Sequence, residues 1–511
     1  MSRRLALPLL LSGLLAIALV RLWLMPLRSS FWVDETATAF VVHYGAQHPS
    51  FAAAPQVPES IYYVLPRAAE KLLGFSEPVY RLPSLLLMGL ALWMVARLAA
   101  RLIHPRAAWF AVFACLALTG FNTQAADARP YALGTATIAL GVWFLVRWLD
   151  TARWRDALAF AAVAALLWRV HLLFAPFYLV FAIYALVHVG RGKSPVRWPQ
   201  VAVITGLVLL ALAPVALRAY GLMRHAGAHV IVAPPTLRDV ANSLKYGLLL
   251  VCGVGAWLSR RIAGRALGTA PGASPPAPNP EDSLLILSYW LCQPLCLFAV
   301  SLVTGSSVFV SRYYSPALAG TALAATLWAS RSLSGRAWKP AAAVLGVGAL
   351  LMAGQWNRLW PLHQKSDWRG AAGEVRELAL DPATPVICPS PFVEARPPVW
   401  SPAYRLPGFL YAHLAVYPLA GRVLLFPFED SPQAESYAAG LAGTTLAAAR
   451  SFVIYGGAGQ AGFWWKWLAA RPELAGWSSR RTGDFGDVTV VLFSNQRAAV
   501  SRGPGSLDSS R

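Results

Sequence analysis

The sequence predicts a polytopic α-helical membrane protein with a small soluble α/β domain at its C-terminal end. The chain of 511 residues is 57% hydrophobic and only 13% charged, which is about half the charged share of an average soluble protein. Apolar runs of about 17–22 residues recur along most of the chain, and as helices they would cross a hydrocarbon core of about 30 Å. Roughly the last 150 residues instead alternate short apolar runs with helical patterns, as in an α/β domain.

The apolar runs predict eleven membrane-spanning helices. The stretch 157–189 is too long for one crossing, and the letters "WRVH" at 168–171 divide it into two. The first run could be mistaken for a cleaved signal peptide, but it continues through "LVRLWLMPL", which favours a retained helix. The predicted spans are 5–27, 82–102, 107–122, 132–149, 156–169, 171–189, 200–217, 243–258, 284–304, 313–330 and 340–357.

Basic clusters give these spans an orientation. The N-terminal "MSRR" and the loops after every even-numbered span carry two or more Lys or Arg next to a span end, so they are predicted to face the cytoplasm. This orientation places residues 28–81 outside the cell as a first outer loop. It places the Pro/Gly/Ala-rich linker at 258–283 inside the cell. It divides the chain into a transmembrane domain at 1–357 and an extracytoplasmic α/β domain at 358–511.

The net charge of +21 does not indicate a nucleic-acid partner. The basic residues occur in short clusters between apolar runs, which is the distribution of anchors that face anionic membrane lipids. A groove of basic residues with interleaved aromatics, as nucleic-acid binding requires, is not evident. Four of the five cysteines lie in apolar runs, which is not a disulfide framework.

The C-terminal part predicts four strands and two helices. The strand patterns are "PVICPS", "RVLLFPF", "RSFVIYGG" and "DVTVVLFS", and the helical patterns are "DWRGAAGEVRELAL" and "GFWWKWLAAR". The letters "GAGQAG" at 457–462 fit a dinucleotide fingerprint locally. They lack a convincing strand-end acid about twenty residues later, so we expect a glycine-eased turn there, or at most an anion site at a helix N-terminus.

Polar residues at predicted span ends suggest a site. Asp34 and Glu35 directly follow the first span, and other polar outliers fall on the same predicted outer side. Ionisable groups at membrane depth are costly and tend to line a cavity or a site. A carboxylate can accept a proton from an acceptor, and arginine can hold a phosphate with paired hydrogen bonds. These outliers are Asp127, Arg129, Tyr131, Arg169, His171, Lys245, Arg312, Tyr313 and Tyr314.

Structural alternatives exist for each of these residues. Asp34 and Glu35 would also suit a solvated loop just beyond a helix. Arg129 and Arg312 would also suit interfacial positions from which the charged head reaches water. His171 would also suit a purely structural hydrogen-bonding role.

The order of the motifs resembles the bacterial branch of the GT-C glycosyltransferases, the superfamily of the protein O-mannosyltransferases and of the aminoarabinose transferase of lipid A. "FWVDETATA" follows the first span, "YY" and then "YRLPSLL" lead into the second, "DARPYAL" opens the fourth, and "SRYYSPALAG" enters a late one. "DWRGAA" at 367–372 resembles the start of the outer domain appended in that family. The resemblance covers about residues 1–335, and no single motif decides it.

The resemblance implies transfer of a sugar from a polyprenyl-phosphate donor to an acceptor at the outer face of a bacterial inner membrane. The acceptor would be a cell-envelope glycan, lipid or protein. By position, Asp34 corresponds to the first-loop catalytic acid and Glu35 to its companion. Two departures concern the second outer loop, where the family usually has Glu at the position of Asp127 and where Pro130 stiffens the following turn. The implied substrate-binding set is Asp127, Arg129, Tyr131, His171, Lys245, Arg312 and Tyr313.

Two rival functions and one cofactor question stay open at this point. A lipid or glycolipid flippase without transferase activity would also need ionisable residues in the membrane, but nearer its midplane and in repeated halves. A non-catalytic scaffold is the other rival. Asp34, Glu35 and Asp127 could hold a divalent cation, but no His/Cys ligand set demands a metal, and no other cofactor is indicated.

Overall fold

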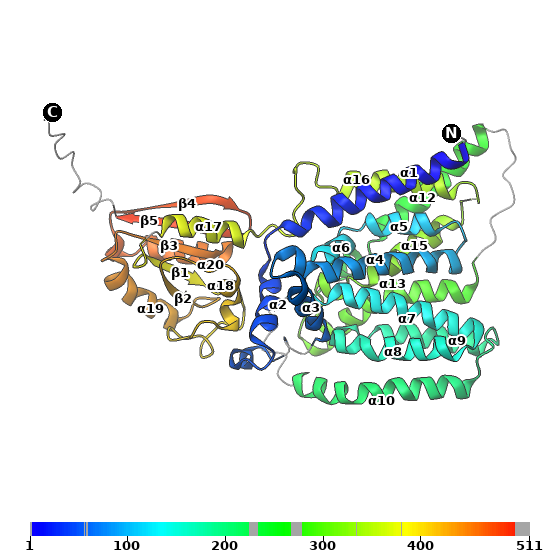
Figure 1. Ribbon diagram of the computed structural model, residues 1–511, viewed down its shortest axis with the longest axis horizontal. Helices are drawn as coiled ribbons and strands as arrows, with labels where there is room; N and C mark the ends of the chain where they lie inside the picture. The colour runs from blue at the N-terminus through cyan, green and yellow to red at the C-terminus, as the bar shows by residue number, and fades with distance from the viewer. Residues whose placement is uncertain are drawn as a thin grey trace. The chain divides into compact units, whose positions relative to one another are not determined.

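The computed structural model describes residues 3–55, 57, 60–223, 233–266, 278–333, 335–379 and 381–495. The chain divides into two compact units (Figure 1). The membrane unit comprises residues 1–28 and 59–363, and the α/β unit comprises residues 29–58 and 364–511. Residues 29–58, which the sequence assigns to the first outer loop of the transmembrane domain, therefore group with the C-terminal part of the chain.

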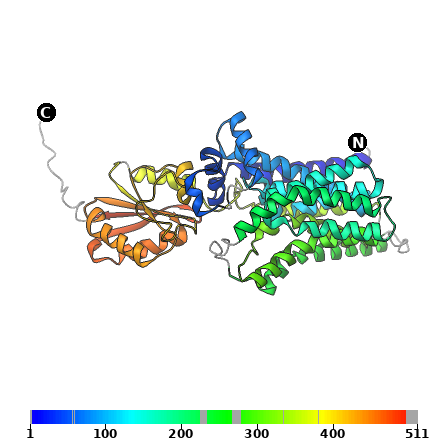
Figure 2. The same cartoon turned by 90° about the horizontal axis from the view of Figure 1, so that it is seen from below.

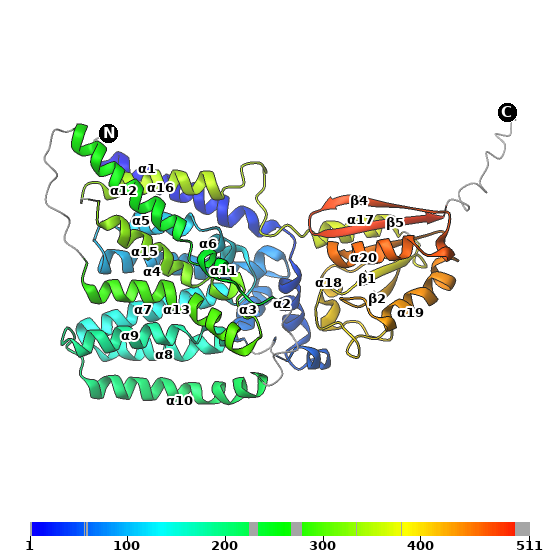
Figure 3. The same cartoon turned by 180° about the vertical axis from the view of Figure 1, so that it is seen from behind.

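Each predicted span coincides with a helix of the membrane unit, and these helices form a bundle in which several lie side by side (Figures 1 and 3). The predicted division of 157–189 is confirmed, because one helix ends at Val170 and the next begins at Phe177. Residues 267–277 of the predicted linker lie outside the described residues. The helices are α1 (Arg3–Leu19), α4 (Glu77–Leu102), α5 (Ala108–Leu116), α7 (Tyr131–Thr151), α8 (Trp154–Val170), α9 (Phe177–Gly190), α10 (Trp198–Met223), α12 (Tyr246–Ala266), α13 (Pro280–Thr304), α15 (Ala317–Ser330) and α16 (Trp338–Ala353).

Fewer helices than the predicted eleven are long and apolar enough to span a membrane. Among the described residues there are six, or up to eight if each of two bent helix pairs is one span. Helices α15 and α16 have only 14 and 16 residues, which gives about 21–24 Å at 1.5 Å per residue. Segments Ala108–Leu116 and Thr119–Ala126 meet at 82°, and Leu237–Ser243 and Tyr246–Leu258 meet at 48°. Hydropathy detects apolar runs but neither their helical length nor their bends.

Close helix packing depends on small residues at several contacts. Helices α13 and α15 approach each other so closely that a Cβ on Gly320 would lie 2.6 Å from the carbonyl carbon of Tyr289. A Cβ on Gly134 of α7 would lie 2.1 Å from the ring of Phe174. Such contacts are typical of membrane helices, whose association depends on backbone approach and van der Waals packing.

The predicted first outer loop is largely helical. It contains α2 (Val33–Tyr44), which belongs to the α/β unit, and α3 (Val64–Leu73), which belongs to the membrane unit. The prediction that the acid pair lies in a loop is therefore wrong, because both acids lie in the first turn of α2. The amphipathic pattern at 59–74 does form a helix, and Leu72 and Leu73 of α3 are 82% and 61% exposed, as an interfacial helix requires.

The C-terminal part of the α/β unit folds around a mixed five-stranded sheet of order β2-β1-β3-β5-β4. Strands β1 and β2 are parallel, β1 and β3 are parallel, and β5 pairs antiparallel with both β3 and β4. Figure 2 shows the sheet with its helices in a second view. The strands are β1 (Pro385–Pro389), β2 (Arg422–Phe426), β3 (Ser451–Gly457), β4 (Trp477–Phe485) and β5 (Val488–Asn495).

Four strands and two helices of this sheet domain are predicted correctly, whereas one strand and two α-helices of its described part are missed. The predicted helices are α17 (Trp368–Leu378) and α20 (Ala458–Ala469). The "GAGQAG" segment consists of the last residue of β3 and the first five residues of α20, so the strand passes directly into the helix. The missed strand β4 is a polar edge strand, whose letters "WSSRRTGDF" lack an apolar run. The missed helices are α18 (Ala412–Val416), which is short, and α19 (Pro432–Leu441).

Candidate active site

A cluster of basic and aromatic side chains forms where three segments of the membrane unit meet. Arg129 and Tyr131 lie at the start of α7, His171 follows the end of α8, and Arg312 and Tyr313 lie in the short helix α14 (Ser311–Tyr314). The ring of His171 lies 5.9 Å from that of Tyr131 and 5.2 Å from that of Tyr313. The two tyrosine rings are 6.3 Å apart. We call these five residues the basic-aromatic cluster.

The two arginines give this cluster its charge. Arg129 and Arg312 both interact electrostatically with His171, and the guanidinium carbon of Arg312 lies 5.3 Å from the ring centre of Tyr313. Both arginines are half-buried, which leaves them less screened than surface charges. The N-terminus of α7 adds the partial positive charge of its unpaired backbone N–H groups. Together these groups favour binding of an anion.

Gln293 of α13 joins two segments of the cluster and was not singled out from the sequence. Its Nε2 donates to the carbonyl oxygens of Leu173 at 2.7 Å and of Tyr313 at 2.9 Å. The side chain is fully buried, so these bonds hold the turn after His171 and the helix α14 in one arrangement. The sequence offered one weak sign, an amide within an apolar run.

Asp127, the predicted acid of the second outer loop, lies next to a histidine that the sequence did not indicate. Its carboxylate oxygen Oδ1 is 3.6 Å from Nε2 of His363, and both side chains are buried. The carbonyl oxygen of Asp127 accepts a hydrogen bond of 2.8 Å from the N–H of Arg129. This bond fixes the acid and the first arginine of the cluster in one turn. His363 follows the last predicted span by several residues, and no motif marks it.

Arg21 holds the loop that leads to His363. Its guanidinium donates to the carbonyl oxygens of Gly354 at 2.8 Å, Leu359 at 2.6 Å and Gln355 at 3.1 Å, and it also donates to that of Arg358. The arginine is buried in a π-helical turn that continues α1. Its five donors in a rigid fork suit several carbonyls at once. A cavity of about 30 Å³ lies between Arg21 and His363, which is room for about one water molecule.

The acid pair lies in the α/β unit. Asp34 and Glu35 occupy the first turn of α2, where a negative charge stabilises the helix dipole. The Glu35 carboxylate accepts the N–H of Trp32 at 3.2 Å, which is the role of an acid in a capping box. Glu35 is buried and Asp34 is half-buried. Glu35 thus has a structural task at the helix start, and Asp34 is the better candidate for chemistry.

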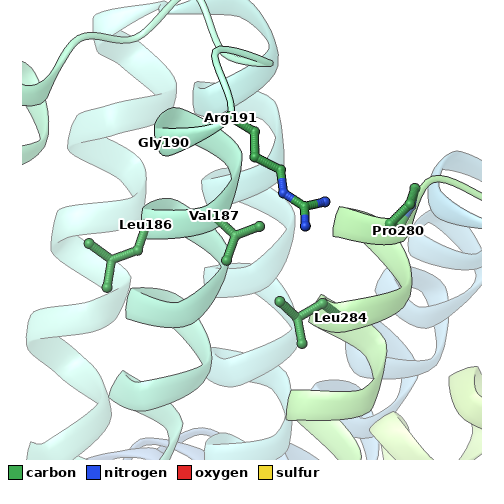
Figure 4. Close-up of a pocket in the computed structure, with 6 residues that line it drawn as sticks. All are labelled: Leu186, Val187, Gly190, Arg191, Pro280 and Leu284. Atoms are coloured by element: carbon green, nitrogen blue, oxygen red, sulfur yellow. The ribbon is translucent and has the colours of Figure 1, made fainter.

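Lys245 does not join the basic-aromatic cluster through any of the described contacts. It is exposed at the bend between α11 (Leu237–Ser243) and α12, with a φ of 50°. A larger cavity, of about 410 Å³, lies between α9 and α13 and is lined by Leu186, Val187, Gly190, Arg191, Pro280 and Leu284 (Figure 4). It contains none of the predicted site residues and lies at the opposite end of α9 from His171.

Comparison with known proteins identifies a domain within the membrane unit. Residues 61–217 match the family described as dolichyl-phosphate-mannose-protein mannosyltransferase. The chain contains a domain of this mannosyltransferase family. No curated protein matches the chain.

Two solved structures share the fold of this chain. ArnT from Cupriavidus metallidurans in the apo state has 15% sequence identity and a TM-score of 0.54, and covers 94% of this chain and 97% of its own. ArnT bound to undecaprenyl phosphate has 13% identity, a TM-score of 0.53 and the same coverage. At such low identity the likeness shows the fold alone. An oligosaccharyltransferase from Archaeoglobus fulgidus covers 95% of this chain and 73% of its own at 13% identity, but its TM-score of 0.33 supports no inference.

The resemblance to GT-C glycosyltransferases stated from the motifs is therefore confirmed. The mannosyltransferase-family domain begins at the "YY" pair and extends beyond "DARPYAL" and "WRVH", so it includes the acid-Arg-Tyr motif and His171. With this domain and this fold, the chain is a multi-pass membrane glycosyltransferase of the GT-C class.

Proposed function

We propose that the protein transfers a sugar from a polyprenyl-phosphate donor to a hydroxyl acceptor at the outer face of a bacterial inner membrane, with inversion at the anomeric carbon. The acceptor would be a glycan, a lipid or a protein of the cell envelope. The observation that carries the proposal is the basic-aromatic cluster, which brings Arg129 and Arg312 to one histidine at helix ends. ArnT, which shares the fold, binds undecaprenyl phosphate, and this chemistry suits the cluster.

In this proposal the cluster holds the phosphate of the donor. Two guanidinium groups would bind the phosphate oxygens and neutralise the charge that grows as the phosphate leaves. Tyr131, Tyr313 and His171 would lie beside the bound phosphate and position it through their polar edges. The phosphate is already a good leaving group, so positioning and charge neutralisation account for most of the required catalysis.

Asp34 would act as the general base. It would accept the proton of the acceptor hydroxyl while the hydroxyl oxygen forms a bond to the anomeric carbon and the polyprenyl phosphate leaves with the bonding electron pair. Glu35 would support its neighbour by fixing the first turn of α2. Asp127 would act beside the cluster through its bond to Arg129. A divalent cation shared by Asp34, Glu35 and Asp127 stays a prediction.

The first test concerns donor binding. Arg312→Ala should weaken binding of a short-chain polyprenyl phosphate more than Arg312→Lys, because lysine keeps the charge and loses only the paired hydrogen bonds. Binding is measured with purified protein in nanodiscs, with Arg97→Ala as a matched control on an exposed arginine of α4. If both Arg312 variants bind as tightly as wild type, Arg312 is an interfacial anchor and Arg129 becomes the better candidate.

The second test separates a transferase from a flippase. Asp34→Asn should lower the rate of sugar transfer or donor hydrolysis by about 10²–10⁴ and leave donor binding unchanged. The substitution is nearly isosteric in a half-buried position, so folding should tolerate it. A flippase would move lipid between leaflets without breaking the sugar–phosphate bond. Wild-type rates for Asp34→Asn would remove the proposed base.

A further inference from the structure

The helix that carries the acid pair is fixed at its start by the C-terminal part of the α/β unit. The N–H of Phe31 donates to the hydroxyl oxygen of Tyr417 at 2.8 Å. The N–H of Arg369 donates to the hydroxyl oxygen of Ser30 at 3.1 Å, and Ser30 lies 3.4 Å from the Tyr417 hydroxyl. Phe31, Ser30 and Tyr417 are all buried. These bonds set the direction in which the chain enters α2.

The segment after α2 is attached to the same part of the unit. The Ser50 hydroxyl accepts the N–H of Phe409 at 3.0 Å. The ring of Phe51 lies 5.3 Å from that of Phe409 and 5.6 Å from that of Phe40 in α2. Helix α2 itself packs against α18. Residues 29–58 are thus held before, along and after α2 by the sheet domain.

Tyr417 forms a hydrogen bond to the backbone just before the acid pair. It directly follows α18, and its own N–H donates to the carbonyl oxygen of His413 at 2.8 Å, so its backbone is fixed by the helix that packs on α2. Its hydroxyl accepts from a residue three positions before Asp34. A helix of 12 residues is marginally stable by itself in water, so its position depends on such tertiary contacts.

We propose that Tyr417 is a positioning residue for Asp34, and that the α/β unit serves the reaction by setting the orientation of α2. This inference rests on the proposed role of Asp34 as the general base. A displacement of a reacting group by about 1 Å can cost on the order of 10²-fold in rate, and the Tyr417–Phe31 bond controls the backbone that leads to the base. The C-terminal sheet is then part of the catalytic apparatus rather than an appendage.

The experiment compares Tyr417→Phe with Tyr437→Phe in the full-length protein. Phenylalanine removes only the hydroxyl at 417, and the buried N–H of Phe31 loses its acceptor. Tyr437 lies in α19 of the same unit, where its ring contacts Trp400 and Phe426, so it controls for loss of a tyrosine hydroxyl elsewhere in the sheet domain. Transfer kinetics are measured together with amide hydrogen exchange.

Three results are expected for Tyr417→Phe. The turnover number kcat falls about 10-fold while the KM for the donor is unchanged. The amides around Phe31 and the first turn of α2 exchange about 10-fold faster, whereas those of β1, β3 and β5 do not. The double variant Tyr417→Phe/Asp34→Asn is no slower than Asp34→Asn alone, because Tyr417 acts through Asp34. Tyr437→Phe changes none of these quantities.

Other results would overturn the inference. An unchanged kcat, an equal loss in Tyr437→Phe, or faster exchange throughout the sheet would each reduce Tyr417 to a residue of general stability. A multiplicative loss in the double variant would show that Tyr417 acts independently of Asp34. If wild-type protein transfers no sugar, the proposed function fails, but hydrogen exchange still tests whether Tyr417 fixes the start of α2. Unchanged exchange near Phe31 in Tyr417→Phe would refute that role as well.

Discussion

Replacing Arg21 with methionine should release the loop at residues 354–362. Of the four carbonyl contacts of Arg21, only the one to Gly354 is fully buried, and the other three are partly exposed. A buried bond to a charged donor contributes about 2 kcal/mol, and partly exposed bonds, which water can replace, contribute about 0.5–1 kcal/mol each. The guanidinium also lies 4.9 Å from the ring centre of Trp356. The four bonds together contribute about 3.5–5 kcal/mol of local stabilisation, and the cation–π contact adds about 0.5–1 kcal/mol.

Trypsin offers a direct assay of this loop, because Arg358 is a cleavage site within it. Local opening limits the cleavage of a folded loop, and each 1.4 kcal/mol changes the open population about tenfold. We therefore expect Arg21→Met to be cut after Arg358 about 100-fold faster or more than wild type, as measured by mass spectrometry of the purified protein. Arg21→Lys keeps the charge without the fork and should lie between the two.

The matched control is Arg97→Met. Arg97 is exposed on α4, where its guanidinium carbon lies 5.3 Å from the ring centre of Trp143, so its replacement removes an arginine–tryptophan contact but no bond to the loop. Equal cleavage rates at Arg358 in wild type and Arg21→Met would refute the reasoning, since the loop would then be held by its own contacts. Equal acceleration by Arg97→Met would point to general destabilisation of the bundle.

Three further predictions concern other parts of the molecule. In intact cells, an impermeant thiol reagent should label a cysteine placed near residue 430 and spare one placed near residue 270. The reverse labelling pattern would show that Asp34 and Glu35 face the cytoplasm. Burial lowers the pKa of His413 to about 3, so the folded state keeps this histidine neutral while the unfolded state takes up a proton below about pH 6.5. As the pH falls from about 6.5 toward about 3, the free energy of unfolding should therefore fall by up to about 1.4 kcal/mol per pH unit. Thermal denaturation of His413→Gln should show a weaker pH dependence. His363→Asn should lower transfer by about tenfold in the presence of Asp127 and have no further effect in Asp127→Asn, and independent losses would separate the two residues.

Sequence alone predicts the parts of this fold that depend on local pattern. In the part of the chain that the structure describes, each apolar run predicted to span the membrane coincides with a helix, and alternating short runs predict four of the five strands. The number of long spans is overestimated, because the bend between α5 and the following segment and the shortness of α15 depend on packing rather than hydropathy. The strand β4 is missed because an edge strand can be polar on both faces.

The sequence predicts those site residues whose charge is costly to place in a membrane. It does not predict the residues that join the site only through partners distant in the sequence. Arg129 and Arg312 stand out because cations at membrane depth are rare, and the structure brings both to His171. His363 and Gln293 carry no motif, and their partners lie 236 and 20 or more residues away. The grouping of residues 29–58 with the sheet domain is a tertiary fact of the same kind, since Tyr417 lies 386 residues from Phe31.

The division of the proposed roles between the two units has a kinetic consequence. The residues proposed to hold the donor phosphate belong to the membrane unit, and the proposed base belongs to the α/β unit. Substitutions of the arginines in the basic-aromatic cluster should therefore lower both donor affinity and kcat, because these groups would hold the phosphate before and during its departure. Substitutions in α2 or at Tyr417 should act mainly on kcat, because they alter an interaction made only as the reaction proceeds. Because residues 29–58 belong to the α/β unit, contacts within that unit would adjust the proposed base without altering the residues proposed to bind the donor. In this proposal the α/β unit contributes to the reaction by holding α2, which carries the proposed base Asp34.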